Sequence, residues 1–148
     1  MGGHPYWYVV DYRSPVEDAL QALRQREFEA GRYSPRTRFP EFPIDSNSPA
    51  PGPVHGSIDE ALEASGYEGT RSILDLTRVS DKPELCSVTA VDDDILEDVF
   101  GTTKPNLDAV EENLFELLED VERGQGIYVT IYEDERPSKL LFAGYSVD

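Results

Sequence analysis

Five segments of the chain have the composition of β-strands: residues 6–12, 72–79, 86–91, 127–133 and 139–147. The first of them is almost entirely aromatic or β-branched, which suits a pleated sheet. The last two follow each other with only residues 134–138 between them, so they predict a hairpin joined by a turn.

Apolar residues recur at a spacing of three or four in four other segments, which predict helices: residues 14–31, 57–66, 92–101 and 106–123. Ser14 and Ser57 each precede a glutamate, Glu17 and Glu60, by three residues, which is the spacing of a capping box. A glycine closes each of the first three helices, as a left-handed C-terminal cap favours.

The order of these elements predicts the fold class. Adjacent strands without an intervening helix favour hairpins, so we expect a single α+β domain with a mixed or antiparallel sheet of about five strands and about four helices. The length of 148 residues also favours one domain. The residues expected to be largely buried are Trp7, Leu74, Leu76, Leu114, Val129 and Ile131.

Residues 34–56 interrupt this pattern with six prolines, which remove backbone donors and exclude a helix. Phe39, Phe42 and Ile44 lie between the prolines, whereas a purely flexible linker rarely carries such anchors. The sequence therefore predicts a long proline-rich loop that is pinned to the domain, and loops of this length are often functional.

The formal net charge of −17 changes the picture of possible partners. It argues against direct binding to nucleic acid and to an anionic membrane surface. No apolar run has the length of a membrane span, and the N-terminus lacks the pattern of a signal peptide, so a cytoplasmic protein is expected. The single cysteine, Cys86, excludes an intramolecular disulfide and a multi-cysteine zinc site, and we expect it to be a small buried hydrophobe.

Acidic residues are concentrated in residues 92–122, which hold twelve carboxylates and one cation, Lys104. One interpretation is a solvated face that keeps the protein soluble. Another is a docking face for a basic protein, since charge complementarity steers association and selects partners. A calcium or magnesium site at Asp92–Asp94 is a third, although the alternating ligands of a calcium loop are missing. The residues predicted to contact a partner are Asp108, Glu111, Glu112, Glu116, Glu119 and Asp120.

The chain lacks the usual catalytic motifs. It has no G-x-S-x-G nucleophile elbow and no phosphate-binding loop of the Walker type. Its two histidines, His4 and His55, do not have the spacing of metal ligands. We therefore predict a non-enzymatic protein of the immunity or antitoxin kind, or a nucleic-acid-mimic inhibitor, without cofactor or metal, that binds a basic protein partner.

A second hypothesis comes from residues 28–79. Gly31, Arg32 and Tyr33 close the first helix, a loop follows, and His55 precedes the next helix and strand. This order resembles ADP-ribosyltransferase-like proteins, including the RES group of NAD-consuming toxins. The resemblance implies an NAD-dependent transferase or glycohydrolase in which Arg32, Tyr33 and His55 contact NAD and Glu133 is the carboxylate that polarises the ribose.

Residues 27–33 and 68–76 also resemble a pattern of small uncharacterised bacterial proteins. This resemblance implies a bacterial source and assigns no function.

Overall fold

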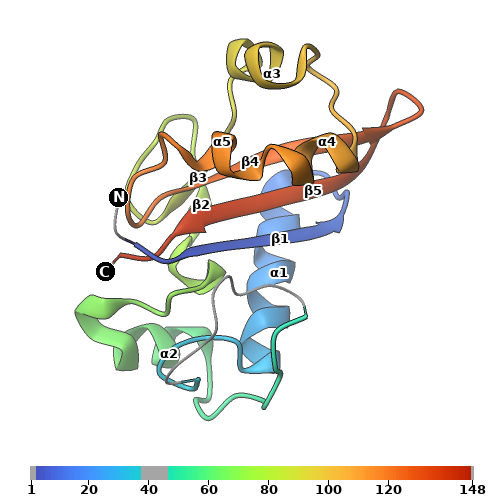
Figure 1. The fold of residues 1–148 in the computed structure, drawn as a ribbon. Coiled ribbons are helices and arrows are strands. Elements are labelled where there is room, and N and C mark those ends of the chain that lie inside the picture. Colours follow the sequence, from blue (N-terminus) through green and yellow to red (C-terminus); the bar gives the residue numbers. More distant parts are fainter. Residues whose placement is uncertain (1–2, 38–46, 148) are drawn as a thin grey trace.

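The computed structural model describes residues 3–37 and 47–147, in which helices cover both faces of a mixed β-sheet (Figure 1). The strands are β1 (Pro5–Asp11), β2 (Arg78–Val79), β3 (Ser87–Ala90), β4 (Gly126–Glu133) and β5 (Arg136–Tyr145). The helices are α1 (Val16–Ala30), α2 (Ile58–Ser65), α3 (Asp93–Phe100), α4 (Leu107–Glu112) and α5 (Leu114–Leu118), with 3₁₀ turns η1 (Gly66–Glu68) and η2 (Ile73–Asp75). The predicted α+β class and mixed sheet are confirmed.

The strand order is β1-β5-β4-β3-β2. β5 pairs antiparallel with both β1 and β4, whereas β3 pairs parallel with β4 and β2. The β4–β5 turn is shorter than predicted, because β5 already begins at Arg136. Asp134 and Glu135 alone form the turn, with φ of 52° and 66°, and positive φ at both positions is the geometry that a two-residue hairpin requires.

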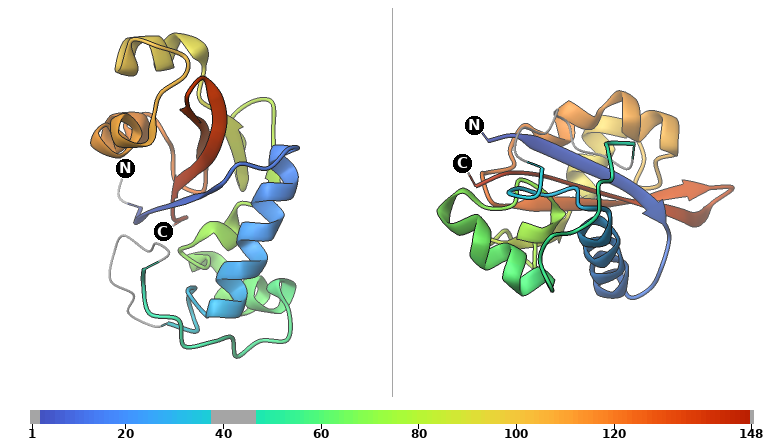
Figure 2. Two further views of the ribbon diagram at one scale, coloured as in Figure 1. Left: turned by 90° about the vertical axis from the view of Figure 1, so that its right-hand side faces the viewer. Right: turned by 90° about the horizontal axis from the view of Figure 1, so that it is seen from below.

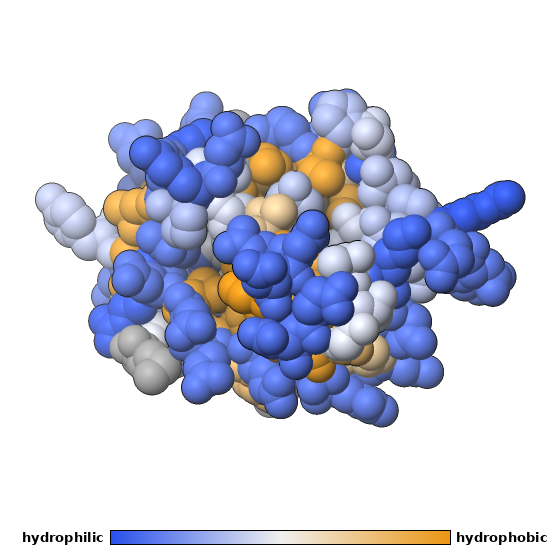
Figure 3. All heavy atoms as spheres, turned by 90° about the horizontal axis from the view of Figure 1, so that it is seen from above, coloured by the Kyte–Doolittle hydropathy of each residue, from blue (hydrophilic) through white to orange (hydrophobic). Residues whose placement is uncertain are grey.

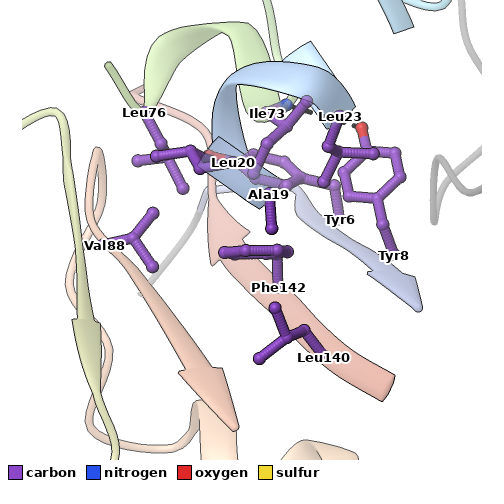
Figure 4. Close-up of a cluster of buried hydrophobic side chains, with 10 residues drawn as sticks. All are labelled: Tyr6, Tyr8, Ala19, Leu20, Leu23, Ile73, Leu76, Val88, Leu140 and Phe142. Carbon is purple, nitrogen blue, oxygen red and sulfur yellow. Dashed lines mark hydrogen bonds between the residues drawn. The ribbon is translucent and has the colours of Figure 1, made fainter. Parts of the chain in front are cut away.

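Alternation along the strands divides the core into two layers. Tyr6, Tyr8 and Phe142 lie on the face that α1 covers, where Figure 4 shows the Phe142 ring beneath Ala19. Leu141 and Ala143 lie on the opposite face, in the cluster to which α3, α4 and α5 contribute. The views of Figure 2 show α1 and α2 on one side of the sheet and α3–α5 on the other.

Most residues predicted for the core are buried, namely Leu74, Leu76, Leu114, Val129 and Ile131. Trp7 is the exception, because it is only half-buried. It lies on β1 at the end of the strand order and on the α4–α5 face, where a groove leaves part of the indole uncovered. Its neighbours Tyr6 and Tyr8 point to the α1 face and are fully buried.

The predicted strand over residues 72–79 is wrong for its first part. Side chains close a turn there instead: Ser72 Oγ accepts a hydrogen bond from the Leu74 amide at 3.2 Å, and Asp75 Oδ1 accepts two from Thr70 at 2.8 Å each. These local bonds offer the backbone an alternative to a sheet ladder. Only Arg78–Val79 pair with β3.

The predicted helix over residues 106–123 is also wrong, since it breaks at Asn113 into α4 and α5 and ends at Leu118. The Asn113 side chain donates to the Ala109 carbonyl at 2.8 Å, and such back-bonding competes with the helical backbone. Asp108 and Glu112, four residues apart, lie together on α4, whereas Glu116 lies on α5.

The two predicted capping boxes have different outcomes. Ser57 caps α2 as predicted, accepting from the Glu60 amide at 3.2 Å. Ser14 does not cap α1, which has Pro15 at the N-cap and no side-chain cap. Glu17 instead accepts a hydrogen bond from the Val79 amide at 3.2 Å, so it ties α1 to β2.

The described parts of the proline-rich loop, residues 34–37 and 47–56, contain neither helix nor strand. Phe39, Phe42 and Ile44 lie outside the described residues. The loop returns to the end of α1, where the Gly52 amide donates to the Ala30 carbonyl at 2.9 Å. Gly31 has a φ of 78°, and a Cβ there would collide with the Gly52 backbone, so glycine is required at this approach.

Within the described residues, no helix combines the length and the apolar content needed to cross a membrane.

Candidate functional site

The helices above the sheet form an acidic layer, by which we mean the carboxylates of residues 92–122. All of them are solvent-exposed. They are Asp92, Asp93, Asp94, Glu97, Asp98, Asp108, Glu111, Glu112, Glu116, Glu119, Asp120 and Glu122.

Amphipathic packing places these carboxylates outward. Leu96 of α3, Val110 of α4, and Leu114 and Leu118 of α5 are buried against the sheet, and the acidic positions of these helices face water. Figure 3 looks onto this face, where hydrophilic side chains dominate and hydrophobic ones gather between them. The layer includes all six residues predicted to contact a partner.

No carboxylate of the acidic layer forms an ion pair with a cation among the residues the structure describes. Lys104, the one cation of this stretch, binds Glu135 in the β4–β5 turn at 3.2 Å instead. Among the described residues, the layer is therefore an extended surface of negative charge without paired cations.

Two large hydrophobic side chains are exposed within this acidic surface. Phe115 of α5 is 67% exposed and Ile95 of α3 is 42% exposed. The Phe115 ring packs edge-on against Trp7, with ring centroids 5.7 Å apart and an interplanar angle of 86°. Aromatic and other large apolar side chains of this kind are common anchors in protein interfaces.

Beside this aromatic pair lies an apolar groove of ≈ 440 Å³ between the β1 edge of the sheet and α4–α5. It is lined by Trp7, Val9, Leu107, Val110, Phe115 and Leu141. Glu111 and Lys139 add charge to the lining, but Lys139 Nζ is bound to Asp11 at 2.9 Å. Of the described charged residues that line the groove, Glu111 is therefore the one without an ion pair.

No three histidine, cysteine, aspartate or glutamate side chains are grouped as metal ligands within residues 3–37 and 47–147. The acidic layer, including Asp92–Asp94, thus presents its carboxylates separately to solvent.

The residues of the NAD hypothesis are only partly brought together. Tyr33 Oη and His55 Nδ1 lie 2.7 Å apart in a hydrogen bond, and the Tyr33 ring stacks on Phe28. Tyr33 is fully buried in the cluster between α1 and α2. Arg32 follows it in the chain, yet its guanidinium is turned to Glu27, with Nε 3.5 Å from Oε1.

Glu133 does not join them. It ends β4 at the exposed hairpin, where Oε2 accepts from Ser138 Oγ at 3.4 Å, and Figures 1 and 2 show this hairpin far from α2. Two surface hollows border Glu133, and neither includes Arg32, Tyr33 or His55. The four residues of the NAD hypothesis, Arg32, Tyr33, His55 and Glu133, therefore do not share a cavity in the structure.

Three ionisable side chains near the sheet, Tyr6, Tyr8 and Cys86, have a raised pKa. Burial raises the pKa of Tyr6 well above its usual value, and the Asp75 charge raises it further. Burial also raises the pKa of Tyr8 and, together with Asp75, that of the Cys86 thiol. All three groups therefore stay protonated near neutral pH, and the Cys86 thiol, only partly buried, is not activated as a thiolate.

Sequence reasoning missed a buried carboxylate, Glu27, which is fully enclosed on α1. Its Oε2 lies 3.0 Å from Arg26 Nε, in addition to the Arg32 contact. The sequence does indicate this burial, because Glu27 follows Leu20 and Leu23 at helical spacing and so lies on the same face of α1. The groove beside Trp7 and Phe115 was also not predicted from the sequence.

Comparison with protein-family models, with curated proteins and with solved structures finds no match.

Proposed function

We propose that the protein is a non-enzymatic binding module that docks a basic protein through its acidic layer, in the manner of an immunity protein, an antitoxin or a nucleic-acid mimic. The observation that carries this proposal is the set of twelve exposed carboxylates on one face, with no cation of the described residues paired to any of them. Everything else in the proposal follows from the chemistry of that face.

A concentrated negative surface has two effects on a basic partner. It raises the rate of encounter through long-range attraction, and it disfavours acidic proteins by like-charge repulsion. Proteins that bind nucleic acid present basic clefts to phosphate groups. Carboxylates spread over α3, α4 and α5 supply the same sign of charge, so they can occupy such a cleft and exclude its nucleic acid.

The acidic layer also has a cost to the protein itself. Asp108 and Glu112 lie four residues apart on α4, and a like-charged pair at this spacing destabilises a helix by about 0.2–0.5 kcal/mol. Surfaces usually intersperse both signs of charge, and a large field of one sign serves to steer a partner. Concentration of one sign on one face therefore favours docking over solvation.

The proposal predicts that neutralising the acidic layer weakens binding to a basic probe. The acidic-layer variant carries Glu112→Gln, Glu116→Gln, Glu119→Gln and Asp120→Asn. The probe is a synthetic peptide of arginine and glycine with one central alanine. Four lost surface attractions at about 0.2–1 kcal/mol each predict a Kd raised about fourfold or more at low salt.

A matched control variant removes the same number of charges from the opposite side of the sheet. It carries Asp18→Asn, Glu29→Gln, Asp59→Asn and Glu63→Gln, all exposed on α1 and α2. Because this variant keeps the acidic layer, we expect its Kd for the probe to rise less than threefold. Equal weakening in both variants would mean that only the net charge matters and would contradict the proposal.

A further inference from the structure

We propose that the apolar groove beside Phe115 receives a hydrophobic side chain of the partner, so that the partner's docking segment is basic with one apolar anchor. This inference rests on the proposed function, since it names the chemistry of the segment that the acidic layer attracts. The occupant is thus a cationic peptide segment with a leucine-like or aromatic residue among its arginines and lysines.

The first support is the exposed apolar surface. Phe115 is 67% exposed although it packs on Trp7, and the groove of ≈ 440 Å³ is lined by aliphatic and aromatic side chains of β1, β5 and α4. Burying such a surface is favourable, and interface hot spots are typically aromatic residues in pockets surrounded by polar groups.

The second support is the charge around the groove. Glu111 lies in the lining, and Asp108 and Glu112 are exposed on the same helix. Lys139 does not offset them, because Asp11 holds it at 2.9 Å. An apolar side chain entering the groove therefore brings its flanking residues against carboxylates, which selects cations at those positions.

The same charge argues against a second copy of this chain as the occupant. Each copy carries a formal net charge of −17, so two copies meeting at this face would place acidic layers against each other. A basic partner removes that repulsion.

Trp7 makes the inference directly testable, because it is the only tryptophan of the chain and it lines the groove. Two peptides without aromatic residues are compared: the arginine–glycine peptide with central alanine and the same peptide with central leucine. We expect the leucine peptide to bind about tenfold more tightly and to shift the emission of Trp7 to shorter wavelength, as the indole loses water.

Phe115→Ala and Ile95→Ala provide the matched pair of variants. Both remove an exposed hydrophobic side chain above the sheet, but only Phe115 lines the groove. We expect Phe115→Ala to abolish the preference for leucine and Ile95→Ala to retain it. The acidic-layer variant should bind both peptides more weakly by the same factor, so that it still prefers the leucine peptide.

These outcomes separate the two proposals. If the wild-type protein binds both peptides equally and Phe115→Ala changes nothing, the groove inference is overturned while the acidic layer still docks cations. If neutralising the acidic layer leaves the Kd of both peptides unchanged, the proposed function fails as well. Two results in the absence of peptide would also overturn the groove inference. If the emission of Trp7 shifts as the protein concentration is raised, a second copy of the chain occupies the groove. If the emission of Trp7 shifts in the Phe42→Ala variant, the chain itself occupies the groove.

Discussion

Replacing Glu27 with glutamine is expected to lower the free energy of unfolding by about 3–5 kcal/mol, because removing one partner of a buried ion pair leaves the other charge uncompensated. Glu27 is fully buried, and the Arg32 side chain is only 11% exposed. Glutamine keeps the size of the side chain but removes its charge, so the ion pairs of Glu27 with Arg26 and Arg32 are lost.

Urea denaturation followed by circular dichroism measures this change. Glu29→Gln is the control, since Glu29 lies on the same helix but is exposed, and its change should stay within about 0.5 kcal/mol. A loss of less than about 1 kcal/mol in the free energy of unfolding for Glu27→Gln would contradict a stabilising role for the ion pairs of Glu27 with Arg26 and Arg32.

Replacing Phe142 with alanine is expected to cost a similar 3–5 kcal/mol, here because a buried aromatic ring leaves a cavity. Phe142 is fully buried in the middle of the core beneath α1, where the stiff neighbours Tyr6 and Tyr8 limit collapse into the vacated space. A domain of this size has a total stability of about 5–15 kcal/mol, so the loss is a large part of it.

The same denaturation experiment measures this prediction, with Phe115→Ala as the control. Phe115 is 67% exposed, so its truncation should change the free energy of unfolding by less than about 1 kcal/mol. Similar losses in the free energy of unfolding for Phe142→Ala and Phe115→Ala would contradict the assignment of Phe142 to the buried core and of Phe115 to the exposed surface.

The fold could be predicted largely from local signals. Alternation in β1, β4 and β5 and the glycines after α1, α2 and α3 act over a few residues, and the structure contains these strands and helix ends. The errors at residues 72–79 and at Asn113 have one physical cause. In both places a polar side chain forms a hydrogen bond to the nearby backbone, and the spacing of apolar residues along the chain gives no sign of such bonds.

The candidate site was predictable in its charge but not in its shape. Exposure of the carboxylates follows from the apolar stripes of α3–α5, which are visible in the sequence. The groove is not visible there, because it brings together Trp7 and Phe115, which are more than a hundred residues apart in the chain. Tyr33 and His55 are joined by a hydrogen bond, whereas Glu133 lies at the far hairpin.

The most direct test of docking through the acidic layer is capture from a lysate of the native host at low salt, with the wild-type protein, the acidic-layer variant and the opposite-face control variant immobilised side by side. We expect the wild-type protein and the control variant to retain the same basic protein, and the acidic-layer variant to lose it. Equal retention by all three proteins, or no basic protein retained by the wild type, would contradict the account.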